Sequence, residues 1–213
     1  TYSGGLTKFD GTNWSKYNTS NSLLPSNIVR TIAIDESGTK WIGTANSGLT
    51  KFDGTNWTVY KSTNSVLPND NVTSVVIDGS GLKWIATGGG GLVKFDGTDW
   101  TIFNTSNSGL SNNYIWSILI GENGLKWIGT DESFVKYDNT NWAVTRTSNS
   151  GIPSNYTWTV AVDGEGTKWI GTSRGGLTKF DGTGWTSYNT QNSNLPNNFV
   201  QLIAIDENES KWI

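Results

Sequence analysis

The chain has 213 residues, with 15 lysines and arginines against 18 aspartates and glutamates, and its formal net charge is −3. Because positive charge is neither abundant nor clustered, nucleic acid is excluded as an expected partner. Cysteine, methionine and histidine are absent, which excludes disulfides, thiolate and imidazole catalysis and the usual soft metal ligands, and no apolar run approaches the roughly 20 residues that would insert into a membrane.

The tryptophans recur with a constant spacing. Two series run through the whole sequence with intervals of 42 or 43 residues: Trp14, Trp57, Trp100, Trp142 and Trp185, and Trp41, Trp84, Trp127, Trp169 and Trp212. A period of this size is typical of solenoids, propellers and repeat arrays. The chain therefore consists of five repeats, and we interpret the periodic tryptophans as packing residues.

Each repeat is predicted to contain four short strands and no helix. In the second repeat, taken in chain order, the expected strands are 72–78, 83–86, 92–95 and 100–103. Asp78 to Gly81 supplies the first turn, which we interpret as a hairpin rather than a calcium loop, as we do 163–166. Asp96-Gly97 predicts a two-residue hairpin turn. We interpret the equivalent aspartates as turn formers: Asp10, Asp53, Asp96 and Asp181, and Asp35, Asp78, Asp163 and Asp206.

Four antiparallel strands in about 43 residues predict one propeller blade. We therefore expect an all-β, five-bladed β-propeller that forms a single domain over residues 1–213. The first two strands of the last repeat, near 198–213, would share a blade with the strands near 1–19, which places the ring seam within one blade that joins the termini. The alternative is a slice of a longer array of seven or eight blades.

The repeat resembles a known family. Lys-Trp-Ile-Gly-Thr is followed by Gly-Gly-Leu-Thr-Lys-Phe-Asp-Gly, then Leu-Pro-x-Asn, then an apolar strand that ends in Asp. This order is similar to the two-component regulator propeller repeat over all five periods. The resemblance implies a β-propeller of the kind found in extracytoplasmic sensor domains of bacterial hybrid histidine kinases, which detect polysaccharide breakdown products, and in secreted or surface proteins. The plan of near-identical blades is also similar to lectins such as tachylectin-2.

Two sets of positions differ between repeats while the surrounding pattern is kept. The first set lies at the start of the first strand and consists of Arg30, Thr73, Trp116, Trp158 and Gln201, preceded two residues earlier by Ile28, Asn71, Tyr114, Tyr156 and Phe199. The second set lies in the loop between the second and third strands and consists of 2–3, 45–46, 88–89, 131–132 and 173–174. In an antiparallel blade both sets lie at the same end.

Aromatic and polar residues in these sets predict a carbohydrate site. Sugars present apolar C–H faces and hydroxyls, which suit aromatic rings beside amide, carboxylate or guanidinium groups. The candidate ligand-binding residues are Trp116, Trp158, Tyr114, Tyr156, Arg30, Gln201, Glu132, Arg174 and Asn46. The alternative for Trp116 and Trp158 is that they fill the space between the innermost strands.

Catalysis is not expected. Glycoside hydrolysis needs two carboxylates that face each other across a cleft, whereas Asp131 and Glu132, the acidic pair outside the repeat pattern, are adjacent in sequence. We expect no metal and no cofactor. The sequence predicts a monomeric, extracytoplasmic propeller that binds an oligosaccharide or another polar small ligand; the alternative is a surface or secreted scaffold with protein partners.

Overall fold

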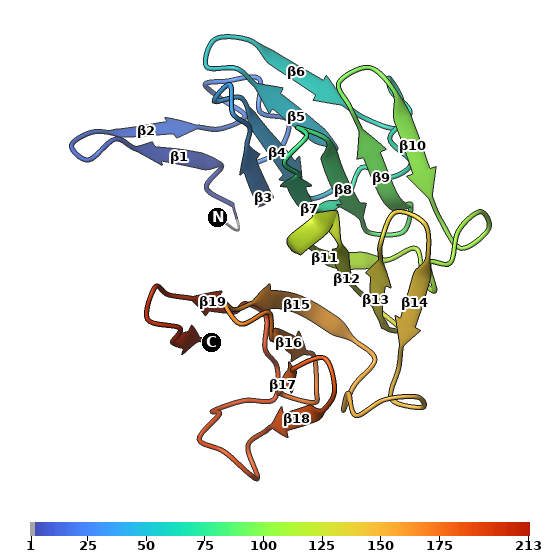
Figure 1. The fold of residues 1–213 in the computed structure, drawn as a ribbon. Helices are drawn as coiled ribbons and strands as arrows, with labels where there is room; N and C mark the ends of the chain where they lie inside the picture. Colours follow the sequence, from blue (N-terminus) through green and yellow to red (C-terminus); the bar gives the residue numbers. More distant parts are fainter. Residues whose placement is uncertain (1–2) are drawn as a thin grey trace. The chain divides into compact units, whose positions relative to one another are not determined.

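The computed structural model describes residues 3–213, so that Tyr2 of the second variable set lies outside the described residues. The chain divides into two compact units, 1–102 and 103–213, which are described separately. Both consist of antiparallel β-sheets (Figure 1). Within residues 3–213, no helix is long and apolar enough to cross a membrane.

The first unit contains a two-stranded sheet and two four-stranded sheets, each with its strands in chain order. The strands are β1 (Leu6–Phe9) and β2 (Trp14–Tyr17); β3 (Val29–Ile34), β4 (Lys40–Thr44), β5 (Leu49–Phe52) and β6 (Trp57–Tyr60); and β7 (Val72–Ile77), β8 (Lys83–Thr87), β9 (Gly91–Phe95) and β10 (Trp100–Phe103). The four strands predicted in the second repeat are confirmed, with ends that differ by one residue at most.

The second unit contains two four-stranded sheets and a second two-stranded sheet. Its elements are β11 (Ile115–Ile120), η1 (Glu122–Gly124), β12 (Lys126–Thr130), β13 (Phe134–Tyr137) and β14 (Trp142–Thr145); β15 (Thr157–Val162), β16 (Lys168–Thr172), β17 (Leu177–Phe180) and β18 (Trp185–Tyr188); and β19 (Ala204–Ile205) and β20 (Lys211–Trp212). The repeated all-β plan is thus confirmed. The five-bladed ring and its shared blade stay predictions, because β1–β2 and β19–β20 are separate sheets.

One short helix was not expected. The turn after β11 forms a single 3₁₀ turn, η1, in which Asn123 has φ 55° and Gly124 has φ 70°. In four repeats an aspartate occupies the start of this turn and accepts backbone hydrogen bonds, whereas the third repeat has Gly121. Without that carboxylate, the Leu125 N–H donates to the Glu122 carbonyl at 3.1 Å and the turn tightens.

The hairpin between the third and fourth strands is longer than predicted. Phe52 pairs with Trp57, which leaves four residues rather than two in the connection. The Asp53 Oδ1 accepts the N–H groups of Thr55 at 2.8 Å and Asn56 at 2.7 Å. The carboxylate thus accepts hydrogen bonds from two backbone N–H groups that have no partner on the opposite strand, and this stabilises the wider loop. The aspartate is a turn former as predicted, although the turn type was wrong.

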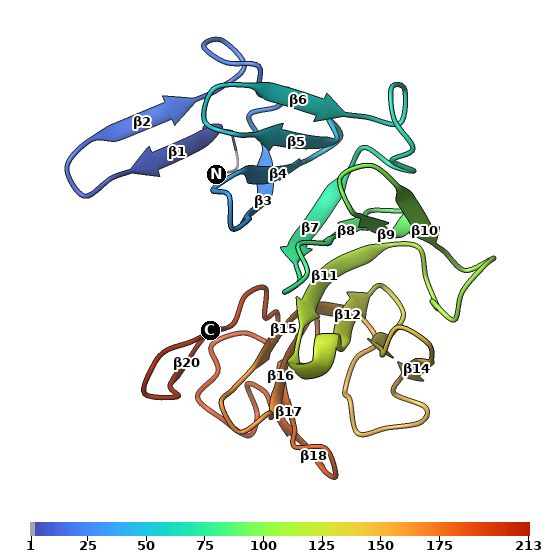
Figure 2. The same cartoon turned by 45° about the horizontal axis from the view of Figure 1, so that its top comes forward.

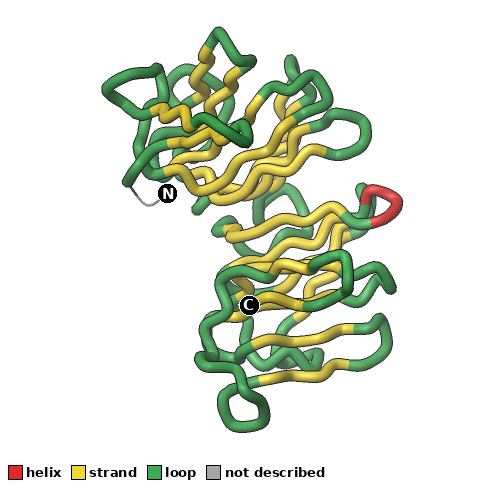
Figure 3. The backbone as a smooth tube through the Cα atoms, turned by 90° about the vertical axis from the view of Figure 1, so that its left-hand side faces the viewer, coloured by secondary structure: helices red, strands yellow, loops and turns green. Residues whose placement is uncertain are grey.

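Packing between neighbouring sheets forms the core of each unit. In the first unit, Trp41 and Leu49 pack against Val75 and Phe95 of the next sheet. In the second unit, Trp127 and Phe134 pack against Val160 and Ile170. The tube in Figure 3 follows these successive sheets within each unit. Hairpin tryptophans add ring stacking, as between Phe52 and Trp57 with centroids 4.0 Å apart. The predicted packing role of the periodic tryptophans is confirmed for these positions.

The two-stranded sheets are less covered than the four-stranded ones. Phe9 on β1 is 51% exposed, whereas Phe52 at the equivalent place on β5 is 6% exposed. Trp212 on β20 is 66% exposed, compared with 3% for Trp41. Figure 2 shows β1 and β2 as a hairpin with no further strand beside them in their sheet. Residues that are core in a complete sheet are therefore exposed in the half sheets.

Candidate functional site

The first variable set lies on a β-bulge. In each of the four complete sheets the register between the first two strands shifts, and the extra residue is Arg30, Thr73, Trp116 or Trp158. A bulge bends the strand and turns one side chain away from the regular alternation. The fold therefore presents a non-repeated side chain at a repeated backbone feature. Gln201, the equivalent residue of the last repeat, precedes β19.

The second variable set is tied to the same end of the sheet by backbone hydrogen bonds. In the second unit, the Asp131 N–H donates to the Tyr114 carbonyl at 3.3 Å, and the Ser173 N–H donates to the Tyr156 carbonyl at 3.1 Å. In the first unit, the Ala45 N–H donates to the Ile28 carbonyl at 3.0 Å. The predicted meeting of the two sets at one end of each sheet is confirmed.

Four aromatic rings from three consecutive repeats of the second unit form one contiguous cluster, here called the aromatic ladder. Its members are Tyr114, Trp116, Trp158 and Phe199. The Trp116 and Trp158 rings stack with centroids 3.9 Å apart and an interplanar angle of 24°. The ring centroids of Tyr114 and Trp116 lie 4.6 Å apart. The Phe199 ring packs edge-on against the Trp158 ring, with centroids 5.1 Å apart. The sequence placed these residues in adjacent repeats, and the bulges bring them into contact.

The two indoles of the ladder differ in their hydrogen bonds. Trp116 Nε1 donates to Asp131 Oδ1, which couples the ladder to the neighbouring loop. Trp158 Nε1 is buried and has no hydrogen-bond partner in the described part of the chain. A buried donor without an acceptor costs about 1–3 kcal/mol. The ladder thus contains one buried indole donor that the described chain leaves unsatisfied.

The remaining candidate residues differ in exposure and in the unit to which they belong. Tyr156 is 49% exposed and Phe199 40% exposed, so both offer accessible ring surface, whereas Trp116 and Trp158 are partly buried. Glu132, Arg174 and Gln201 are exposed residues of the same unit. Arg30 and Asn46 belong to the first unit, and both are exposed. The site is therefore described from the second unit alone.

Sequence reasoning missed two residues of this cluster as site residues. Phe199 was noted only as a neighbour of Gln201, although its ring contacts Trp158. Asp131 was placed in the second variable set and considered as a catalytic carboxylate, but not as a ligand-binding residue, whereas it accepts the Trp116 indole N–H. The signal for Phe199 was its position two residues before the variable site, shared with Tyr114 and Tyr156. Nothing local in the sequence indicates the bond between Asp131 and Trp116, 15 residues apart.

Comparison with known proteins supports the fold. No protein-family model and no curated protein matches the chain. Among solved structures, the extracellular domain of the hybrid two-component system BT3049 from B. thetaiotaomicron matches with 27% identity over 81% of this chain and 24% of that one, at a TM-score of 0.72. The extracellular domain of BT4673 from the same organism gives 24% identity, 93% and 27% coverage, and a TM-score of 0.74.

A more distant match is an enzyme. Virginiamycin B lyase from Staphylococcus aureus shares 13% identity over 86% of this chain and 62% of its own, at a TM-score of 0.69. This likeness concerns the fold alone. The chain spans about a quarter of the length of the two extracellular domains. 

The sheets show an all-β repeat protein built from four-stranded antiparallel sheets, and a propeller fold is consistent with them and with these matches. The resemblance to the two-component regulator propeller family is confirmed by the likeness to extracellular domains of hybrid two-component systems.

Proposed function

We propose that this chain is a non-enzymatic, ligand-binding propeller that recognises an oligosaccharide at the aromatic ladder. The observation that carries the proposal is the combination of contiguous aromatic surface with the unpartnered Trp158 Nε1. The C–H faces of a sugar would pack on the exposed rings of Phe199 and of Tyr156, which lies two residues before Trp158. A hydroxyl oxygen would accept the indole N–H of Trp158 after the side chains that bury it shift on binding. Glu132, Arg174 and Gln201 would supply hydrogen bonds at the rim.

Calorimetric titration with a panel of plant, algal and host oligosaccharides tests this proposal. We expect one ligand per chain, because the ladder occurs once in residues 3–213. Trp158→Phe keeps an aromatic ring and removes the N–H, so it should weaken binding about tenfold. Phe199→Ala should weaken it through lost stacking. Trp185→Phe, on the fourth strand of a sheet in the same unit, is the control and should bind normally.

Two results would reject the oligosaccharide proposal. One is the absence of saturable binding across the panel by a folded protein. The other is binding that Trp158→Phe and Phe199→Ala leave unchanged.

The extracellular domains that the chain resembles support a further proposal, which concerns location. The protein would be extracytoplasmic in a bacterium: in the periplasm, on the cell surface or secreted.

We also propose that β19–β20 and β1–β2 form the fifth blade of a closed ring. In the repeat, β19 and β20 correspond to the first and second strands of a complete sheet, and β1 and β2 correspond to the third and fourth. Their exposed Phe9 and Trp212 occupy positions that are buried in complete sheets, and pairing of β20 with β1 would cover them. The competing scaffold function would instead use these half sheets to bind another chain.

A disulfide distinguishes the two arrangements. Ile42 pairs with Thr50 between the second and third strands of a complete sheet, and the equivalent residues are Ile213 and Thr7. Ile213→Cys combined with Thr7→Cys should form an intramolecular disulfide, because paired strand positions suit its geometry and the chain has no other cysteine. Non-reducing electrophoresis and mass spectrometry give the readout. Disulfides only between copies would contradict the closed ring and favour the scaffold.

A further inference from the structure

A hydrogen bond between an aspartate and a tryptophan closes the turn between the first two strands in four of the five repeats. The indole Nε1 donates to the aspartate Oδ2 at 2.8–3.0 Å in the pairs Asp35–Trp41, Asp78–Trp84, Asp163–Trp169 and Asp206–Trp212. The third repeat keeps the tryptophan, Trp127, at the same spacing but has Gly121 in place of the aspartate. Its indole N–H has no hydrogen-bond partner among the described residues.

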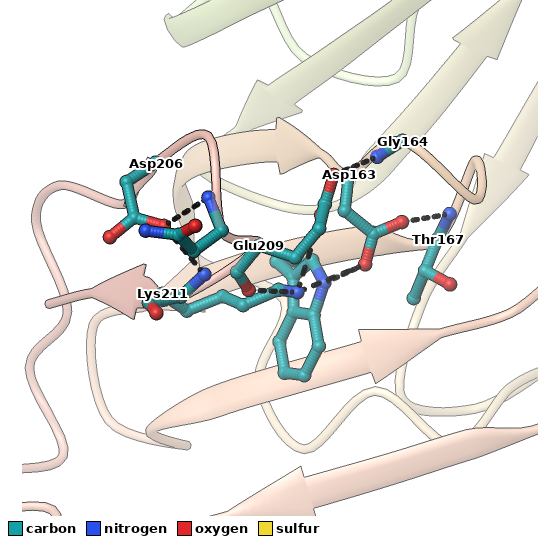
Figure 4. Close-up of polar contacts among 9 residues, drawn as sticks. Asp163, Gly164, Thr167, Asp206, Glu209 and Lys211 are labelled. Carbon is teal, nitrogen blue, oxygen red and sulfur yellow. Dashed lines mark hydrogen bonds and ion pairs between the residues drawn. The ribbon is translucent and has the colours of Figure 1, made fainter.

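In the fourth repeat, a lysine from the following repeat contacts both members of the Asp163–Trp169 pair. Lys211 Nζ lies 5.0 Å from the centroid of the Trp169 ring. It also lies 3.3 Å from Asp163 Oδ2, and Figure 4 shows these two labelled side chains. The carboxylate therefore receives an indole N–H and an ammonium group together. Burial alone would raise the pKa of the Asp163 carboxyl, but hydrogen bonds from Trp169, Thr167 and Lys211 lower that pKa below its ordinary value. A carboxylate in this place is held in its charged form.

The third repeat retains both donors. Lys168 Nζ lies 5.2 Å from the centroid of the Trp127 ring, as Lys211 does from Trp169. Lys168 also donates to the Gly166 carbonyl at 2.5 Å, which holds the ammonium at the turn and leaves it further N–H groups. Trp127 and Lys168 thus reproduce the donor pair of Trp169 and Lys211, without a carboxylate between them.

A cavity occupies this place. It has a volume of about 450 Å³, and its lining includes Gly121, Asn123, Trp127, Asp163, Gly166 and Lys168. Trp127 is 6% exposed and lines the cavity, so its indole N–H, which has no partner among the described residues, borders this space. The corresponding cavity in the first unit, where Asp35 is present, measures about 260 Å³. The larger volume lies within the range of small-molecule sites.

We propose that this cavity binds a small ligand with one carboxylate group, of the size of a sugar acid. The ligand carboxylate would take the position that an aspartate occupies in the other repeats and accept hydrogen bonds from Trp127 Nε1 and Lys168 Nζ. A singly charged group fits better than a phosphate or sulfate, because Glu122 and Asp163 also line the cavity and would repel a second negative charge. The cavity lies at the end of β11, where Leu119 and Ile120 line it, whereas Trp116 of the aromatic ladder lies near the start of this strand. This proposal is therefore independent of the oligosaccharide proposal.

Sodium glucuronate is the probe that tests the site. In ¹H–¹⁵N spectra of the uniformly labelled protein, the Trp127 indole signal should shift saturably with glucuronate and not with glucose or with sodium chloride at equal ionic strength. Lys168→Met keeps most of the side-chain stem and removes the charge, so it should weaken glucuronate binding about tenfold.

Gly121→Asp supplies the missing carboxylate from the protein itself. Gly121 has φ −94°, and an added Cβ would lie 3.5 Å from Trp127 Nε1, so an aspartate fits without backbone strain. This variant should have a higher Tm than the parent and lose the response to glucuronate. A Trp127 signal in the parent that responds to neither glucuronate nor acetate would overturn the proposal, as would equal glucuronate binding by Gly121→Asp. A Tm below that of the parent would show that the turn does not accept the carboxylate, which also contradicts the proposal.

Discussion

Gly129→Ala is expected to lower the free energy of unfolding by about 2 kcal/mol, within the range of overpacked cores. A Cβ at residue 129 would lie 2.6 Å from the Thr157 carbonyl oxygen in the first strand of the next sheet and 2.7 Å from Ser117 Oγ. The backbone oxygen belongs to β15 and cannot move away without a shift of the whole strand. The glycine in β12 therefore sets how closely two sheets of the second unit approach.

Urea denaturation of Gly129→Ala and of Gly79→Ala provides the measurement and its control. Gly79 has no atom within 4 Å of an added Cβ, so alanine there should change the midpoint little. The second repeat has Ala86 where the third has Gly129, which shows that the strand itself accepts a Cβ. Equal stability of the two variants would contradict the close approach of the sheets.

Asp163→Ala is expected to cost about 3 kcal/mol of unfolding free energy at neutral pH, because hydrogen bonds to charged groups contribute about 1.5–3 kcal/mol. The substitution leaves Trp169 Nε1, the Thr167 N–H and Lys211 Nζ without their shared acceptor. Asp206→Ala is the matched control, because it breaks the same bond to Trp212 in an exposed setting and should cost less.

The same carboxylates set the pH dependence. A folded-state pKa below the ordinary 3.8 contributes stability at pH values above 3.8, and that stability is lost as the pH falls through the folded-state pKa. Backbone amides lower the pKa of Asp53 to about 2, through Asn56 and Thr55, and that of Asp181 to about 2, through Gly184 and Thr183. The chain has no histidine. Stability should therefore be flat from about pH 5 to pH 8 and fall between about pH 4 and pH 2.

Urea midpoints at pH 8, 6, 4 and 2.5 test this profile. The loss on acidification should be smaller for Asp163→Ala than for the parent, because one of the responsible carboxylates is gone. A midpoint that changes between pH 6 and pH 8, or an identical acid profile for the variant, would contradict the assignment.

The strands of this protein could be predicted because each is marked locally. Tryptophan begins every fourth strand, and an aspartate follows the third, so the hairpins are visible in the sequence. The predicted length of those hairpin loops was wrong. The side-chain oxygen of Asp53 accepts backbone N–H groups within a wider loop, and no dipeptide pattern reveals this. The proposed pairing of the two half sheets would join residues near 1–19 and 198–213, so it is not a local property of either segment.

The candidate site could be predicted only in part. The variation between repeats located Trp116 and Trp158 at one end of neighbouring sheets, but their stacking follows from bulges that the sequence does not mark. Gly121 is visible as a departure from the repeat, yet its meaning depends on the bond between Asp163 and Trp169 in the neighbouring sheet. Repetition thus predicts the framework, and exceptions to it acquire a role only through contacts in three dimensions.

The indole ¹H–¹⁵N signal of Trp158, followed during titration with an oligosaccharide that binds, tests the central proposal most directly. The chain has 12 tryptophans, so the indole region gives at most 12 signals to assign. We expect the Trp158 signal to move downfield to saturation as its N–H gains an acceptor, while the signal of Trp185 stays unchanged. Saturable binding that leaves the Trp158 signal in place would contradict recognition at the aromatic ladder.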